Sequence, residues 1–320
     1  MKLSGGKGFD VIGDIHGCAD AMIALLEKLG YSKQQGVYRH ATRKVIFVGD
    51  IIDRGPKIRE ALHIVKDMVE GGAAEMVMGN HEYNALTYFT PSPPGSSQPY
   101  LVEHTNRRAN LLRETIDEFA NFQQDWKDFL AWFMERPLFL ERDNFRVVHA
   151  YWDADLITQF RHQSGGNVID SQFLEQAATY GSFAFKVMER LLRGLHIVYP
   201  DGITVVGADG LERNRFRTKF WETNPTHYKD IVFQPDGLPK ELEDRELAPQ
   251  ERDQVAHYAD HELPLFVGHY WHQGYPTPLA DNIACLDYSA VKTGRLVAYR
   301  MDRETRLSAD KFVWVDVATV

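Results

Sequence analysis

The chain has 320 residues, of which 44% are hydrophobic and 25% are charged, and its formal net charge is -9 with histidine counted as neutral. This composition is typical of a globular protein, and the acidic balance argues against nonspecific binding to nucleic acid or to a membrane surface. No run approaches the roughly 18 apolar residues of a membrane span, and the first ten residues contain no hydrophobic signal core. Two cysteines, Cys18 and Cys285, provide no disulfide framework and favour a cytoplasmic location.

Three short apolar runs near the start of the chain each lead into a glycine followed by polar side chains. Such runs, without alternation, are typical of strands that are buried on both faces of a sheet. Ligands collect at the carboxyl ends of the strands in open α/β sheets, so we expect the three segments to converge. The runs at 9–12, 45–48 and 75–78 lead into GDIHG (13–17), GDIIDRG (49–55) and GNHE (79–82).

Two amphipathic segments separate these strands. Residues 19–29 and 57–70 carry apolar side chains at helical spacing, and glycines follow both. The alternation of strand and helix predicts parallel strands joined by right-handed crossovers, and therefore an α/β fold.

After Glu82, the pattern predicts further helices at 84–88, 101–121 and 125–135, and an exposed loop at 90–99 that contains four prolines. The aromatic residues of 125–135 keep helical spacing, which favours a place in the core over a stacking platform.

Two later strands each end at a histidine. The run 145–148 leads into His149, and the run 263–267 leads into Gly268 and His269. Residues from about 155 to 262 are expected to form an insertion of helices and loops within a single domain that spans 1–320. Three β-type runs in the tail predict antiparallel strands that complete a second sheet; they lie at 283–286, 296–300 and 312–317.

Six polar side chains at these strand ends form a candidate metal site. Mixed carboxylate, amide and imidazole ligands favour manganese, with iron, zinc, nickel or cobalt as alternatives. Six ligands exceed the needs of one tetrahedral zinc ion. They predict two divalent ions that share a carboxylate, for which Asp50 on the central strand is the natural choice. The six are Asp14, His16, Asp50, Asn80, His149 and His269.

Two ions of this kind activate a bridging hydroxide for direct attack on phosphorus. Nearby residues match the other needs of phosphoryl transfer. Arg54 can bind phosphate oxygens as a fork, and His81 with Asp53 can protonate the leaving oxygen. No covalent phosphoenzyme is expected, because no further nucleophile stands out.

Each motif has an alternative interpretation when it is taken alone. GDxHG and Asp-Arg-Gly are common in turns, and GNHE is compatible with the start of a helix. The motifs occur in order, each after a buried-strand pattern, and two strand-end histidines follow. Together they predict a dinuclear metal site.

These motifs, with VVHA (147–150) and VGH (267–269), resemble the phosphoprotein phosphatase-like branch of the calcineurin-like metallophosphoesterase superfamily, in its bacterial form. The resemblance implies a four-layer α/β/β/α sandwich of two mixed sheets. It also implies that Asp53 and His81 form the acid pair and that Arg54 binds phosphate. For the metals, it assigns Asp14, His16 and Asp50 to the first ion, and Asp50, Asn80, His149 and His269 to the second.

Two features refine the resemblance. The final motif reads GHYW, so Trp271 stands where many superfamily members have a further histidine ligand, and the phosphoprotein phosphatase branch also lacks that ligand. The branch usually supplies a second phosphate-binding arginine before the final histidine. Arg213 and Arg217 are favoured over Arg215 for this role, and a solvated basic loop is the alternative.

The expected activity is hydrolysis of phosphate monoesters or phosphoanhydrides in a small phosphorylated molecule. The segment after His149 resembles bacterial relatives, including dinucleoside-polyphosphate hydrolases, more than eukaryotic protein phosphatases. A Ser/Thr phosphoprotein phosphatase and a non-catalytic scaffold that binds phosphorylated partners are the alternatives. No nucleic acid, membrane or obligate protein partner is expected.

Overall fold

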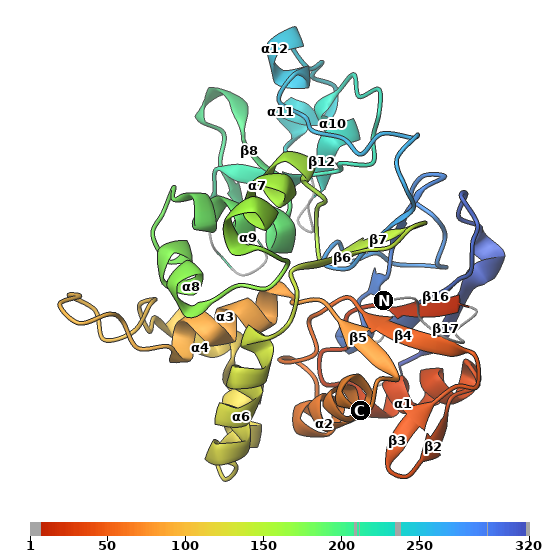
Figure 1. Ribbon diagram of the computed structural model, residues 1–320. Helices are drawn as coiled ribbons and strands as arrows, with labels where there is room; N and C mark the ends of the chain where they lie inside the picture. The colour runs from red at the N-terminus through yellow and green to blue at the C-terminus, as the bar shows by residue number, and fades with distance from the viewer. Residues whose placement is uncertain (1–7, 208–209, 211, 234–237, 293, 318–320) are drawn as a thin grey trace. The chain divides into compact units, whose positions relative to one another are not determined.

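The computed structural model describes residues 8–207, 210, 212–233, 238–292 and 294–317 (Figure 1). It divides into two compact units, one formed by the residues up to Leu192 and from Leu263 onward, and the other by Arg193–Glu262. The interpretation of 1–320 as one domain with an insertion at about 155–262 stays a prediction. None of the described helices is both long and apolar enough to cross a membrane.

The first unit contains a six-stranded mixed sheet. Strands β1, β4 and β5 are parallel, as the sequence predicts, and β16 pairs with β1 in the antiparallel direction. Strands β15 and β17 both pair with β16. The strands are β1 (Gly8–Ile12), β4 (Arg43–Phe47), β5 (Ala74–Met76), β15 (Asp287–Tyr288), β16 (Arg295–Met301) and β17 (Phe312–Asp316).

A second mixed sheet, of four strands, packs against the first. Strands β7, β13 and β14 are parallel and β6 is antiparallel to β7. Buried side chains of the two sheets form one core cluster, in which Val11 and Val48 join Phe145 and Phe266. The strands are β6 (Phe139–Glu141), β7 (Arg146–Val148), β13 (Leu265–Val267) and β14 (Ile283–Cys285).

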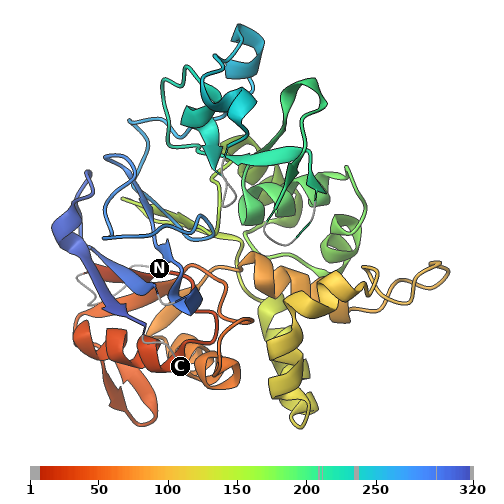
Figure 2. The same ribbon diagram turned by 180° about the vertical axis from the view of Figure 1, so that it is seen from behind.

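Helices cover the outer face of each sheet. α1 (Ala19–Lys28) and α2 (Ile58–Glu70) lie on the first sheet in both views (Figure 1, Figure 2). On the second sheet, Phe160 of α7 (Ala154–Ser164) packs edge-on against Phe139 of β6. Helices α8 (Ser171–Ala177) and α9 (Phe183–Arg193) follow α7 along the chain. The predicted α/β/β/α sandwich of two mixed sheets is confirmed.

A helical layer precedes β6 in the first unit. Phe119 packs against Trp126 and Phe129 of α6, so the aromatic residues of this region belong to the core, as predicted. The helix expected at 101–121 is instead two short helices that meet at Leu112. The helices are α3 (Asn80–Phe89), α4 (Asn106–Leu111), α5 (Arg113–Phe119) and α6 (Gln123–Met134).

The prediction that the tail strands complete the second sheet is wrong for β16 and β17. Both belong to the first sheet, beside β1, and only β14 joins the second sheet, where it runs parallel to β13. Apolar runs show that a strand is buried but do not show which neighbour it pairs with, because pairing depends on long-range packing.

A small hairpin lies outside the expected elements. β2 (Ser32–Gln34) and β3 (Val37–Arg39) pair around Gln35 and Gly36, which both have positive φ, at 50° and 89°. Two consecutive left-handed residues match the turn that joins tight hairpins. The sequence did not show this hairpin because β2 is exposed and polar.

The second unit has a hydrophobic core of its own, in which Phe216 packs between Tyr199 and Tyr228. Strand β11 pairs with β8 and β12, while β9 and β10 form a separate pair. The elements are β8 (His196–Val198), β9 (Val205–Val206), β10 (Glu212–Arg213), β11 (Arg215–Thr218), α10 (Tyr228–Ile231), β12 (Val232–Phe233), α11 (Lys240–Glu243) and α12 (Pro249–Arg252). Three short 3-10 helices complete the described structure, at Pro200–Gly202 in this unit and at Ala290–Lys292 and Ala309–Lys311 in the first.

A buried charge cluster ties three strands of the first sheet together. Asp10 of β1 is fully buried, and its Oδ1 accepts from the Nε atoms of Arg43 (3.0 Å) and Arg300 (3.2 Å) on the two flanking strands. The Tyr31 hydroxyl donates to Oδ2 at 2.9 Å. Removing one partner of such a buried pair leaves uncompensated charge behind.

We therefore expect Asp10→Ala to lower the free energy of unfolding by about 3 to 5 kcal/mol. Urea denaturation followed by circular dichroism measures this change. The matched control is Asp20→Ala, because the Asp20 carboxylate is mostly exposed and bonded to Lys57 at the surface; its unfolding midpoint should stay that of the wild type. Equal shifts for the two variants would contradict the role assigned to Asp10.

Candidate metal centre

All six predicted ligands lie in the first unit, at the carboxyl ends of strands from both sheets. Asp14 and His16 follow β1, Asp50 follows β4, and Asn80 opens α3 just after β5. The other two come from the second sheet, where His149 follows β7 and His269 follows β13. All except His269 are buried.

Asp50 lies at the centre of the group. Its Oδ2 is 3.4 Å from Nε2 of His149, 3.7 Å from Nε2 of His16 and 3.8 Å from Nε2 of His81. Two sets of possible ligand atoms lie within 4.8 Å of one another: His16, Asp50 and His81, and Asp50, His149 and His269. Asp50 is common to both sets, which is the place that a bridging ligand would occupy.

Asp14 and Asn80 lie beside these two sets. Asn80 Oδ1 is 3.1 Å from Nε2 of His149, and the His269 amide donates to Asp14 Oδ2 at 3.1 Å. The other Asp14 oxygen, Oδ1, is buried and has no hydrogen-bond partner within the described part of the chain. A buried carboxylate oxygen without a partner is costly, and a cation would satisfy it.

Two of the buried imidazoles, those of His16 and His149, are oriented as metal ligands usually are. Nδ1 of His16 is 2.8 Å from the Ile52 carbonyl, and Nδ1 of His149 is 2.7 Å from the Val48 carbonyl. Because a carbonyl only accepts, each Nδ1 carries a proton, and this leaves Nε2, on the side of Asp50, as the nitrogen that can bind a metal ion. The residues present therefore fit divalent metal ions.

The backbone around the site turns sharply. His16, Asp50 and His269 all have positive φ, at 44°, 53° and 61°. This conformation costs roughly 1 to 2 kcal/mol for a residue other than glycine, and such strain is often found at functional sites. Glycines let the segments approach: a Cβ on Gly268 would lie 2.0 Å from Asp14 Oδ1, and one on Gly79 would lie 2.3 Å from Asp50 Oδ1.

Glu82 supports the turn that carries Asp50. Its buried carboxylate accepts backbone N–H bonds from Asp50 (2.9 Å), Ile51 (2.8 Å) and Gly79 (3.0 Å). Burial and the nearby Asp50 charge raise the pKa of Glu82, although these bonds oppose the rise. Sequence reasoning recorded Glu82 only as the last residue of GNHE and assigned it no role.

The charges of the ligand set are strongly coupled. Burial raises the pKa of Asp50, but the imidazoles of His149, His81 and His16 outweigh it and hold that pKa well below its usual range. Burial lowers the pKa of His149, and the Asp50 carboxylate more than offsets this, raising it to about 10. Burial and the Asp287 carboxylate raise the pKa of Asp14 well above its usual range.

Asp287 is a buried carboxylate near the site that sequence reasoning missed. It opens β15, and the preceding residue, Leu286, lies so close that a Cβ on Gly13 would be 2.0 Å from its carbonyl oxygen. A signal was present, because the apolar run Ile283–Leu286 leads directly into Asp287, as the other runs lead into the predicted ligands.

The three predicted catalytic residues also lie together. His81 Nδ1 is 2.6 Å from Asp53 Oδ2. The Arg54 guanidinium is 3.3 Å from His16 Nε2 and 3.2 Å from His81 Nε2. Since a guanidinium only donates, both imidazole nitrogens accept in this arrangement.

Arg213 and Arg217, the predicted phosphate-binding arginines, belong to the second unit. Arg213 lies on β10, and Arg217 lies on β11, where its guanidinium is 5.8 Å from the centre of the Phe233 ring. Their role stays a prediction.

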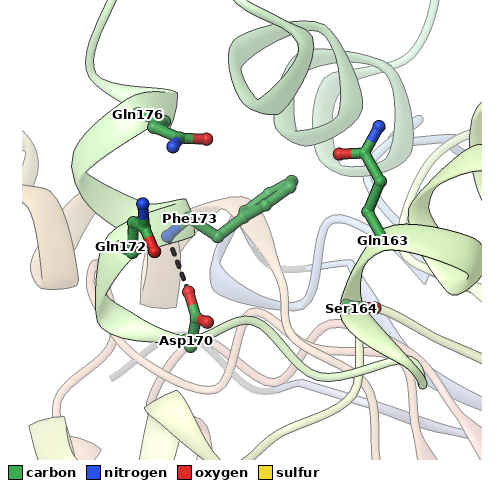
Figure 3. A pocket seen from close by; sticks show the side chains of 6 residues that line it. All are labelled: Gln163, Ser164, Asp170, Gln172, Phe173 and Gln176. Atoms are coloured by element: carbon green, nitrogen blue, oxygen red, sulfur yellow. Dashed lines mark hydrogen bonds between the residues drawn. The ribbon is translucent and has the colours of Figure 1, made fainter.

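A polar pocket of about 190 Å3 lies between α7 and α8 and contains none of the predicted site residues (Figure 3). Asp170 at its edge caps α8 by accepting from the Phe173 amide at 2.7 Å, as the dashed line in Figure 3 marks. The lining side chains are Gln163, Ser164, Asp170, Gln172, Phe173 and Gln176.

Comparison with known proteins gives a family and named relatives. The sequence model described as calcineurin-like phosphoesterase matches residues 8–178. The asymmetrical bis(5'-nucleosyl)-tetraphosphatase PrpE of Bacillus subtilis is 44% identical over 160 residues, which are 48% of this chain and 61% of that protein. The symmetrical bis(5'-nucleosyl)-tetraphosphatase of Pasteurella multocida is 24% identical over 299 residues, 91% of this chain and 93% of that protein.

The match to PrpE spans only about three-fifths of that relative's length. Among solved structures, a protein serine/threonine phosphatase from Saccharomyces cerevisiae is 14% identical, with a TM-score of 0.47, and the similarity covers 99% of this chain and 81% of that chain.

We expect Gly268→Ala to reduce the number of divalent ions bound per chain, because the new Cβ would displace Asp14. Metal content after equilibration with Mn²⁺ and dialysis measures the effect. The matched control is Gly166→Ala, since a Cβ at Gly166 would meet no atom of the described residues within 4 Å. The control should bind as many ions as the wild type. Identical metal content in both folded variants would refute the close contact at Asp14.

We also expect ion binding to release at least one proton at neutral pH. The pKa of His149 is raised to about 10, so its imidazole is protonated before an ion binds and must lose that proton to bind one. The affinity should therefore rise with pH through neutrality. Calorimetric titration with Mn²⁺ in buffers of different ionisation enthalpy counts the protons, and His149→Ala should release fewer. An affinity for Mn²⁺ that does not change with pH, without proton release, would contradict the assignment of His149 as a metal ligand.

Proposed function

The chain belongs to the calcineurin-like phosphoesterase family, and from this premise we propose that it is a dinuclear-metal-dependent hydrolase of phosphoanhydrides or phosphate monoesters. The observation that carries the proposal is the position of Asp50. It belongs to both sets of possible ligands, and the His81–Asp53 pair lies directly beside it. This arrangement matches the two needs of phosphoryl transfer, which are charge stabilisation and proton delivery.

The metals are proposed to be two divalent ions, manganese first, held by Asp14, His16, Asp50, Asn80, His149 and His269. When bound, such ions supply Lewis acidity toward phosphate oxygens and a water of lowered pKa. Two observations support this assignment: among the described residues the buried Asp14 Oδ1 has no hydrogen-bond partner, and the Nδ1 atoms of His16 and His149 are bonded to backbone carbonyls.

The chain's own residues orient the phosphate and move a proton. Arg54 would exchange its two imidazole acceptors for phosphate oxygens, which are stronger acceptors for a guanidinium. Once released from Arg54, His81 Nε2 can carry the proton that the leaving oxygen needs. Asp53 holds the opposite nitrogen of the ring at 2.6 Å and stabilises the imidazolium.

The proposed substrate is a small phosphorylated molecule of the dinucleoside polyphosphate class. The names of the bacterial relatives, which are bis(5'-nucleosyl)-tetraphosphatases, support this choice. Arg213 and Arg217 are proposed as further phosphate-binding residues. A cytoplasmic location is proposed from the two buried free thiols, Cys18 and Cys285.

We expect Mn²⁺-dependent turnover of a dinucleoside tetraphosphate to exceed turnover of p-nitrophenyl phosphate, a Ser/Thr phosphopeptide and a bis-aryl phosphodiester. Initial rates on the four substrates with the metal-loaded protein measure this preference. A preference for the phosphopeptide would replace the proposed substrate with a phosphoprotein. The absence of turnover on all four substrates with both ions bound would refute the proposed enzymatic activity and favour a phosphate-binding scaffold.

Two variants separate the predicted roles. Asp50→Asn should lose at least one ion and nearly all turnover, because both sets share this carboxylate. His81→Asn should keep both ions and lose roughly 10²- to 10⁴-fold in turnover, the usual contribution of a general acid. Measured metal content decides the second case, since loss of an ion in His81→Asn would make His81 a ligand instead.

A further inference from the structure

A buried threonine is hydrogen-bonded to Asp53 through the carboxylate oxygen that does not contact His81. Thr115 lies on α5, is fully buried, and bonds to Asp53 twice. Its Oγ1 accepts from the Asp53 amide at 3.1 Å, and its hydroxyl donates to Asp53 Oδ1. One hydroxyl therefore holds both the backbone and the carboxylate of the same residue.

The bond from the Thr115 hydroxyl completes the surroundings of the Asp53 carboxylate. Oδ1 accepts from Thr115, and Oδ2 contacts His81 Nδ1 at 2.6 Å. With partners on both oxygens, the carboxylate cannot rotate about its Cβ–Cγ bond without losing one of them. The orientation of the His81 ring is thereby linked to a helix that contributes no predicted ligand.

Asp53 needs this support because its backbone is strained. Asp53 and Arg54 both have φ of 69°, so two consecutive residues other than glycine are in the left-handed region. Such conformations persist only where the surrounding structure holds them. The bond from the Asp53 amide to Thr115 is one of the contacts that does so.

Helix α5 is itself anchored to the following segment. Glu118 lies one turn after Thr115, and its carboxylate accepts from the amides of Ile58 (2.7 Å) and Arg59 (2.8 Å). These amides belong to the first turn of α2, where helix geometry leaves N–H groups without intrahelical partners. Thr115 and Glu118 thus tie one face of α5 to both ends of segment 53–59.

We propose that Thr115 is a positioning residue, which acts through Asp53 to hold His81 ready to protonate the leaving oxygen. This role rests on the proposed phosphoesterase function. The positioning role predicts more than a loss of stability. Removal of the Thr115 hydroxyl should impair only those reactions in which the leaving oxygen needs a proton.

The test compares two aryl phosphates that differ in how much their leaving group needs protonation. The p-nitrophenolate ion leaves readily without a proton, whereas the phenolate of phenyl phosphate depends more on a general acid. Thr115→Val removes the hydroxyl and keeps the shape of the side chain. With Mn²⁺-loaded protein, we expect kcat on phenyl phosphate to fall about 10- to 100-fold, and kcat on p-nitrophenyl phosphate to fall by about threefold or less.

Three further variants define the role. Thr115→Ser keeps the hydroxyl and should restore the wild-type ratio of the two rates. Thr115→Val placed in His81→Asn should cause no further loss on phenyl phosphate, because the group that it positions is already absent. The matched control is Thr87→Val, since the buried Thr87 hydroxyl donates within its own helix, to the Tyr83 and Asn84 carbonyls. It should change neither rate.

Metal content and thermal midpoint are measured for every variant. An equal loss on both esters, failure of Thr115→Ser to restore the ratio, or an added loss in the His81→Asn background would overturn the positioning role. If Thr115→Val does not fold, Glu118→Gln replaces it and should show the same selective loss at smaller size. A metal-loaded wild type that turns over neither ester nor a dinucleoside tetraphosphate would instead overturn the proposed function, and this role with it.

Discussion

The site depends on one carboxylate held inside the protein. Asp50 is almost fully buried, and an ionised carboxylate in that position is costly unless charges and hydrogen bonds surround it. Three imidazoles approach its Oδ2, and Glu82 accepts from its amide. Removing Asp50 would leave these groups without their shared partner. The arrangement of the strand ends therefore depends on this single negative charge.

The two-sheet architecture is what brings these partners to Asp50. His16 and His81 come from segments of the first sheet, whereas His149 reaches Asp50 from the second. The strand ends meet because the sheets pack face to face through one apolar core. The close approach then requires small residues and left-handed turns, which explains why Gly268 and Gly79 stand where a Cβ would collide with Asp14 and Asp50.

The support behind the catalytic pair comes from elements that carry no recognisable motif. Thr115 and Glu118 lie on a short helix whose sequence, RETIDEF, is that of an ordinary surface segment. A threonine within a helix usually bonds to its own backbone, as Thr87 does. Only the packed structure shows that Thr115 bonds to a residue 62 positions away.

The sequence alone determined the α/β fold, the parallel order of β1, β4 and β5, and the convergence of Asp14, His16, Asp50, Asn80, His149 and His269. These features could be predicted because a buried parallel strand appears in the sequence as a continuous apolar run. The carboxyl ends of parallel strands lie at the same edge of the sheet, so the side chains that follow them must lie close together. Tertiary structure alone decided that β16 and β17 join the first sheet and that Thr115 lies beside the site. Strand pairing and contacts between distant residues depend on long-range packing, which leaves no trace in the local pattern of side chains.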